Sequence, residues 1–149
     1  MRKLEVFKST GTWTVPTGVT HAVATIIGGG GGTSDNEGSA GTGGTSSVAF
    51  SGGTQSAAGG AGWTYTRAGY SASVTVAGTA NSGQGAQSGA QNNGYGLLSH
   101  IFAGKGVTKV VSANVTAGAS ITVTIGAGGN GGPNGAAGGS GVVFIEYDI

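Results

Sequence analysis

Residues 21–32 read His-Ala-Val-Ala-Thr-Ile-Ile-Gly-Gly-Gly-Gly-Gly, and they join the two kinds of segment from which the chain is built. Residues 21–27 are nearly all apolar, which predicts a central β-strand covered on both faces. The five glycines that follow have no side chains with which to hold a regular helix or strand. We therefore expect residues 28–32 to form a loop or a segment whose backbone packs closely against other backbone.

Further strands are expected on both sides of this stretch. Ile121, Val123 and Ile125 alternate with Thr122 and Thr124, which predicts a half-buried antiparallel strand. Residues 97–102 form an apolar cluster but are too few for their periodicity to distinguish a helical turn from a strand. With roughly six to eight strands and no segment typical of a helix, the sequence predicts an all-β antiparallel β-sandwich. The other expected strands are residues 4–8, 12–15, 47–50, 71–76, 107–115 and 142–149.

The length of 149 residues fits one domain with a single core. We expect residues 1–149 to form one glycine-rich β domain, with a loop-rich insertion over residues 33–106 and a second glycine-rich loop over residues 126–141. The chain contains 35 glycines, each of which loses much conformational entropy on folding. Backbone hydrogen bonds between glycine segments packed side by side, as in polyglycine II, would offset that loss. The alternative is that contact with the surface of a partner offsets the entropy loss.

Charge and composition exclude several classes of protein. Six Lys and Arg against five Asp and Glu give a net charge of +1, too little for a face that neutralises several phosphates of a nucleic acid. Charged residues are only 7% of the chain, which disfavours a metabolic enzyme. There is no cysteine for a disulfide or a thiolate metal site. No apolar run is long enough to span a bilayer, and we expect no secretory signal.

Candidate catalytic and ligand-binding patterns are weak. Residues 126–131 fit the pattern G-x-G-x-x-G, but no helix follows to receive a phosphate. His21 and His100 are the only histidines, too few for a zinc site. Glu146 and Asp148 are expected on the solvent face of an edge strand, where charges discourage unwanted pairing. We therefore expect no catalytic residue, no cofactor and no metal.

The aromatic residues of the polar middle are the strongest candidates for binding a partner. Trp63, Tyr65, Tyr70 and Tyr95 lie where a core has little use for them, and Arg67 lies among the first three. Trp and Tyr give large contact areas with few rotatable bonds, which suits recognition of a glycan or a protein. The alternative is that Trp63 and Tyr65 anchor a loop to the sandwich. Trp13 is expected in the core.

Three ordered stretches resemble the glycine-rich domain of bacteriophage tail proteins. Residues 7–20, followed by a strand and Gly28–Gly32, are similar to the opening of that domain. Residues 115–129 resemble its second signature, and residues 138–147 resemble its closing strand. The three matches cover roughly half of the chain. Residues 33–106 match the family only in composition.

The resemblance implies a non-enzymatic virion protein, made in the host bacterium, that belongs to a tail fibre or tail tip and binds a host receptor. In related adhesins, polyglycine-II helices present loops to a glycan or an outer-membrane protein, so we expect contacts around residues 63–70 and 81–95. One alternative is a capsid decoration or head-fibre protein that binds the major capsid protein. Another is a carbohydrate-binding module. Partners would be other virion proteins, and several copies or a homo-oligomer are expected.

Overall fold

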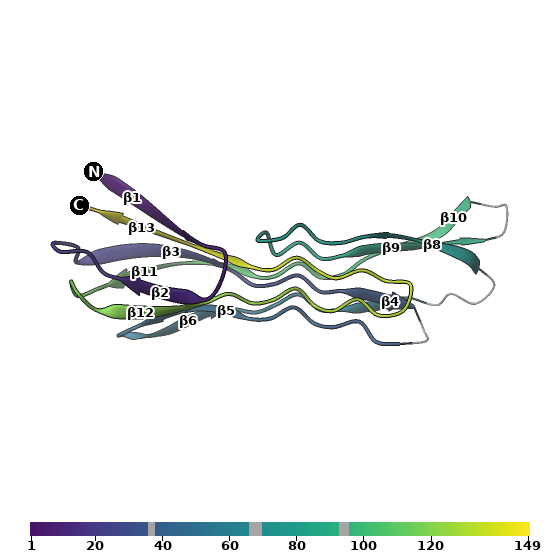
Figure 1. The fold of residues 1–149 in the computed structure, drawn as a ribbon, viewed down its shortest axis with the longest axis horizontal. Coiled ribbons are helices and arrows are strands. Elements are labelled where there is room, and N and C mark those ends of the chain that lie inside the picture. Colours follow the sequence, from purple (N-terminus) through teal and green to yellow (C-terminus); the bar gives the residue numbers. More distant parts are fainter. Residues whose placement is uncertain (36–37, 66–69, 93–95) are drawn as a thin grey trace.

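The computed structural model describes residues 1–35, 38–65, 70–92 and 96–149, with backbone only for residues 35, 65, 70–74, 88–92 and 96–101. The molecule is elongated, with both termini at one end (Figure 1). A β-sandwich occupies that end, a bundle of extended segments forms the middle, and a three-stranded sheet lies at the other end. All regular elements of the described residues are strands, so the expected all-β class is confirmed.

Two four-stranded sheets form the sandwich. The first has the order β1-β13-β3-β11 and the second β2-β12-β5-β6, and both are antiparallel throughout. The first sheet contains β1 (Arg2–Phe7), β13 (Val142–Asp148), β3 (His21–Ile27) and β11 (Thr108–Asn114). The second contains β2 (Gly11–Thr14), β12 (Ser120–Thr124), β5 (Ser46–Phe50) and β6 (Gly53–Ala57).

The hydrophobic core lies between these sheets and follows the alternation of the strands. Ile26, Ile145 and Val123 are fully buried, as period-2 burial of one strand face requires. Trp13 is 4% exposed and its ring lies 5.4 Å from that of Tyr147, which confirms the expected core position of Trp13. Burial raises the pKa of Tyr147, and a hydrogen bond from its hydroxyl to Glu5 Oε1 (3.1 Å) adds to the shift.

Two predictions about the first sheet were wrong. The inward residues of β3 are buried but its outward residues, such as Val23, are half-buried, so β3 is not covered on both faces. Glu146 and Asp148 do not lie on an edge strand, because β13 pairs with β1 on one side and β3 on the other. The sequence does not reveal this order, since β1 and β13 come from opposite ends of the chain.

Residues 28–33 run from β3 through the centre of the bundle, and their hydrogen-bond partners repeat every three residues. The N–H groups of Gly28 and Gly31 donate to the carbonyls of Val107 and Gly104 at 3.0 and 2.8 Å. Gly29 and Gly32 donate to residues 44 and 41, and Gly30 and Thr33 donate to residues 139 and 136. Three residues per turn is the period of the polyglycine-II and polyproline-II conformation. The segments therefore pack as a polyglycine-II bundle.

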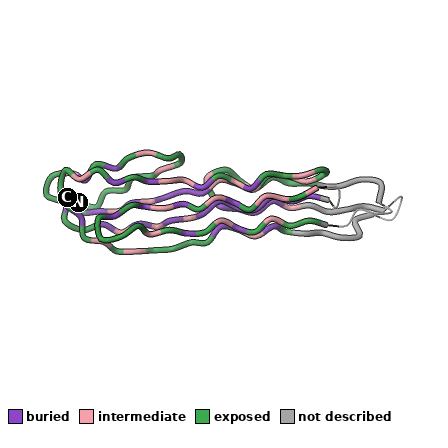
Figure 2. The backbone as a smooth tube through the Cα atoms, turned by 90° about the horizontal axis from the view of Figure 1, so that it is seen from below, coloured by how far each residue is buried: buried purple, intermediate pink, exposed green. Residues whose placement is uncertain are grey.

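Six further segments surround residues 28–33, and we call all seven the glycine bundle. Backbone hydrogen bonds between neighbours close these six into a ring, for example from Gly41 to Asn130 and from Gly138 to Gly129. Alternate members of the ring run parallel and antiparallel to residues 28–33. Buried positions continue from the sandwich into this bundle (Figure 2). In order around the ring, the six are residues 41–44, 58–63, 103–107, 83–86, 136–141 and 126–132.

Glycine is required in the bundle because backbone lies against backbone. A Cβ atom at Gly30 would come closer than 3.0 Å to backbone atoms of Gln84 and Gly85. The same is true at Gly138, where the obstructing atoms belong to Gly30 and Gly31. Only glycine fits where chains approach so closely, as at the axis of the collagen triple helix.

The remaining strands lie beyond or within the bundle. Residues 33–106, expected as a loop-rich insertion, contain these strands as well as β5, β6 and four bundle segments. Residues 97–102, which the periodicity left undecided, belong to a strand, β10. The strands are β4 (Thr33–Asp35) paired in parallel with β7 (Trp63–Tyr65), and β8 (Tyr70–Val76), β9 (Gln87–Asn92) and β10 (Gly96–Phe102) in an antiparallel sheet.

Candidate functional site

The end of the molecule opposite the termini gathers the ends of five strands, and we call it the distal end. Asp35 and Tyr65 end the paired strands β4 and β7. Tyr70, Asn92 and Gly96 lie in one row across the sheet β8-β9-β10. β4 lies next to β9, and β7 lies next to β10, so the two sheets are adjacent. The distal end is therefore joined to the sandwich by the hydrogen-bonded bundle (Figure 1).

Of the candidate binding residues that the structure describes, Tyr65 and Tyr70 lie at this end, and Trp63 lies two residues before it, where β7 leaves the bundle. Trp63 begins β7, its N–H donates to Gly32 O at 3.0 Å, and its side chain is 54% exposed. Tyr65 ends β7 and Tyr70 begins β8, so their backbones lie at the distal end. Arg67 and Tyr95 lie outside the described residues. The choice between recognition of a partner and anchoring of a loop stays a prediction for these residues.

Two apolar residues that the sequence did not single out lie on the sheet β8-β9-β10. Phe102 is 61% exposed and Val76 is 52% exposed. Both are in register with Gln87 of the middle strand, so their side chains project from the same face of the sheet. One feature of the sequence could have identified Phe102. It directly precedes Ala103-Gly104, where the chain passes from a strand into the bundle.

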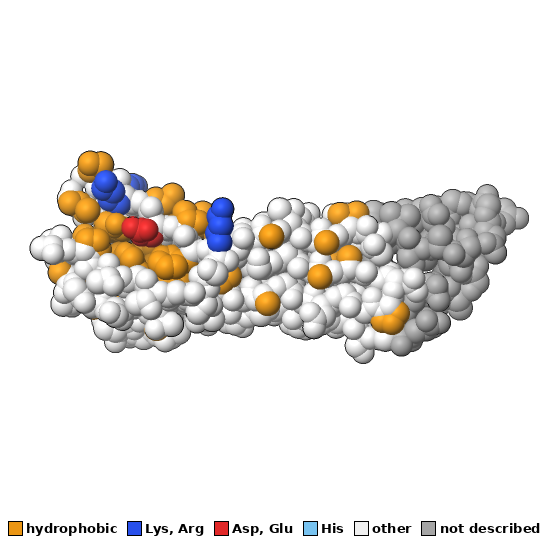
Figure 3. All heavy atoms as spheres, in the orientation of Figure 1, with side chains coloured by type: hydrophobic (Ala, Val, Ile, Leu, Met, Phe, Trp, Pro, Cys, Tyr) orange, Lys and Arg blue, Asp and Glu red, His pale blue; other side chains and the backbone are white. Residues whose placement is uncertain are grey.

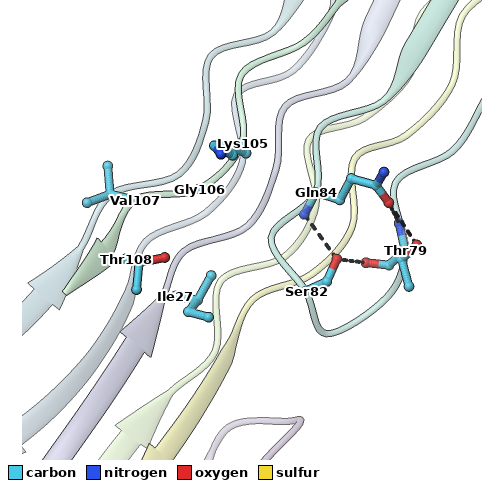
Figure 4. Close-up of a pocket in the computed structure, with 8 residues that line it drawn as sticks. All are labelled: Ile27, Thr79, Ser82, Gln84, Lys105, Gly106, Val107 and Thr108. Atoms are coloured by element: carbon cyan, nitrogen blue, oxygen red, sulfur yellow. Dashed lines mark hydrogen bonds between the residues drawn. The ribbon is translucent and has the colours of Figure 1, made fainter. Parts of the chain in front are cut away.

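A second candidate site is a cleft of about 800 Å³ where the bundle meets the sandwich. One wall is the loop of residues 79–84, and the opposite wall is formed by residues 105–108 with Ile27 (Figure 4). The Thr79 N–H and hydroxyl both donate to Gln84 Oε1, at 2.9 and 2.7 Å. The Ser82 hydroxyl donates to Thr79 O at 2.6 Å and accepts from Gln84 N at 3.1 Å. The loop is thus held in one shape before any ligand arrives.

Asn81 fixes this loop to the rest of the protein. Its φ of 55° is in the left-handed region, which Asn tolerates better than most residues. Its Nδ2 donates to Lys8 O at 2.8 Å and to Gly141 O at 3.1 Å. The Asn81 N–H also donates to Ser140 Oγ at 2.9 Å. The cleft wall is therefore tied to both the sandwich and the bundle.

The cleft is lined by polar and apolar groups with a single charged side chain. Among the residues that line it, Lys105 is the one charged side chain, so the cleft offers no acid–base pair. Thr79, Ser82 and Gln84 give polar groups on one side, and Ile27 and Val107 give apolar contact on the other. Such a mixture orients a small polar ligand or a neighbouring chain.

The two histidines lie in different parts of the fold. His21 begins β3 and its Nδ1 lies 3.3 Å from Asn114 Oδ1, whereas His100 belongs to β10. The described part of the chain contains no group of three or more His, Cys, Asp or Glu side chains placed to hold a metal ion. It also contains no helix long and apolar enough to cross a membrane.

Comparisons with protein-family models, with curated proteins and with solved structures find no match to this chain. The assignment of a function therefore depends on the sequence motifs and on the geometry described above.

Proposed function

We propose that the chain is a non-enzymatic bacteriophage virion protein that acts as a tail-associated fibre or tip component and binds a receptor on the host surface. The observation that carries this proposal is the separation of the two ends by the glycine bundle. The termini and the sandwich lie at one end, and the ends of β4, β7, β8, β9 and β10 lie at the other (Figure 1). Exposed Trp63 lies at the start of β7, where this strand leaves the bundle. Such a shape suits a protein attached to a particle at one end and to a cell at the other.

The bundle gives this arrangement its stiffness. Each N–H from Gly28 to Thr33 donates a hydrogen bond to a neighbouring segment, at 2.8–3.0 Å. Bending the bundle would break several of these hydrogen bonds at once. A single glycine-rich segment without neighbours would instead behave as a flexible coil. The face of the bundle seen in Figure 3 shows few charged or large apolar side chains. We therefore assign it to spacing and the distal end to recognition.

The test is a binding titration of the fluorescently labelled protein on cells of the bacterial host. We expect Trp63→Ala to weaken binding about tenfold or more, because a Trp in the centre of an interface contributes 2 kcal/mol or more. Val110→Ala is the matched control, because Val110 is 64% exposed at the sandwich end. Equal loss with both variants, or binding that neither variant changes, would contradict recognition through Trp63.

A capsid decoration or head-fibre protein is the second candidate, and the outer face of the sheet β1-β13-β3-β11 favours it. Leu4, Val6 and Val110 are 54%, 44% and 64% exposed on this face. Figure 3 shows the apolar side chains gathered at this end of the molecule. Binding of the purified protein to emptied capsids, without binding to host cells, would support this candidate and refute the first.

A further inference from the structure

β1 is an edge strand with one side unpaired. β13 pairs with β1 along its whole length, and no strand of the described residues pairs with the other side (Figure 1). The side chains from Arg2 to Val6 are all exposed, including apolar Leu4 and Val6. An exposed edge strand with apolar residues is a template for pairing with another strand. This surface lies at the sandwich end, so its use does not depend on what the distal end binds.

The hydrogen bonds at the termini show which backbone groups of β1 face outward. The Met1 amino group donates to Ile149 O at 2.7 Å, and Ile149 N–H donates to Met1 O at 2.9 Å. In an antiparallel pair, such mutually bonded positions alternate with unbonded ones. The register of β1 with β13 has no irregularity, so Lys3, Glu5 and Phe7 bond to β13. The N–H and C=O groups of the residues between them, Arg2, Leu4 and Val6, therefore point to the free edge.

We propose that β1 pairs antiparallel with β1 of a second copy of this chain, around a two-fold axis at Leu4. Leu4 then lies opposite the partner's Leu4, and Arg2 lies opposite the partner's Val6. All of these residues have backbone groups that face the free edge, so each can bond across the new pair. The two four-stranded sheets become one continuous sheet. The interface is isologous, as in most homodimers.

Charge selects this register. With the axis at Leu4, Lys3 of each subunit lies opposite the partner's Glu5, in unbonded pairs, where side chains approach most closely. Opposite charges across a strand pair are favourable and like charges are unfavourable. An axis at Lys3 would place two lysines together, and an axis at Glu5 would place two glutamates together. Two antiparallel copies of the sequence Lys-x-Glu therefore place each Lys opposite a Glu. This favours a second copy of the chain as the pairing partner over an unrelated strand.

The test measures mass by sedimentation equilibrium of the whole chain. We expect the wild type to sediment as a dimer, and Lys3→Glu and Glu5→Lys each to raise the dimer dissociation constant about tenfold, since each places like charges opposite one another. A mixture of the two variants should form a heterodimer, because every Glu of one chain then faces a Lys of the other. The double variant Lys3→Glu/Glu5→Lys should recover the wild-type affinity. Lys109→Glu, on the opposite edge strand β11, is the control and should change nothing.

One further variant separates edge pairing from packing of the sheet faces. Leu4→Pro removes an outward N–H and leaves the bonds of β1 to β13 in place, so it should abolish the dimer. Glu5 also accepts a hydrogen bond from the Tyr147 hydroxyl, so Glu5→Lys could disturb the fold. If that variant does not fold, Lys3→Glu and Leu4→Pro decide the result. A monomeric wild type would overturn the proposal. A dimer that survives both Lys3→Glu and Leu4→Pro would also overturn it.

Discussion

Replacing Gly30 by alanine tests the close packing of the glycine bundle. The added Cβ would come closer than 3.0 Å to backbone atoms of Gln84 and Gly85. Neither neighbour can retreat easily, because Ala86 N–H donates to Gly31 O at 2.9 Å and Gly139 N–H donates to Gln84 O at 2.8 Å. Relief of the clash must therefore stretch several hydrogen bonds at once.

The size of the effect follows from the cost of overpacking. Inserting a methyl group into a closely packed interior costs about 1–3 kcal/mol. We expect about 3 kcal/mol for Gly30→Ala, since rigid backbone obstructs the new atom. A domain of this size loses about 2–4 °C of melting temperature per kcal/mol, so the melting temperature should fall by about 6–12 °C.

The assay is thermal unfolding followed by circular dichroism, with Gly52→Ala as the matched control. Gly52 lies in the turn between β5 and β6, and a Cβ there would meet nothing within 4 Å. The control should stay within about 0.5 kcal/mol of the wild type or be slightly more stable. A Gly30→Ala variant that melts within about 1 °C of the control would refute the packing argument.

Three other variants test the sandwich and the cleft. Gly118 has a φ of 81° with open space around it, so Gly118→Ala should cost about 1–2 kcal/mol through backbone strain alone, and a urea midpoint equal to the wild type would contradict this. Asn81→Ala removes the hydrogen bonds to Lys8 O and Gly141 O, so amide exchange of residues 79–84 should accelerate at least tenfold while that of β3 stays unchanged. The raised pKa of Tyr147, caused by burial and by Glu5, means that the folded protein holds this proton more tightly than the unfolded chain. Stability should therefore fall as pH rises above about 10, and Tyr147→Phe should show a smaller decrease in melting temperature over that range.

The sequence predicted the sandwich well because side-chain alternation reports strand faces directly. Ile121 and Val123 are buried as expected, and Trp13 lies in the core. The order of the strands in the sheets was harder to predict, because nothing in the sequence of β13 shows that β1 pairs along its edge. The bundle was predicted only as a possibility, since glycine carries no pattern that identifies its neighbours.

The candidate site was predictable only in part. Trp63 stood out because a large aromatic residue among glycines has no obvious core to join, and its exposure agrees with that reasoning. Phe102 was missed because its apolar neighbours suggested a buried segment. The cleft beside residues 79–84 was also missed, because it brings together segments far apart in the sequence.

Amide hydrogen exchange of the isolated protein tests most directly whether the glycine bundle is ordered by its own backbone hydrogen bonds. The N–H groups of Gly28 to Gly32 all donate to other bundle segments. We expect them to exchange as slowly as the N–H groups of Ala24 and Ile26 in β3, because the bundle and the sandwich should open together. Exchange of Gly28 to Gly32 as fast as that of Gly52 in its exposed turn would show that the bundle needs a partner to be ordered.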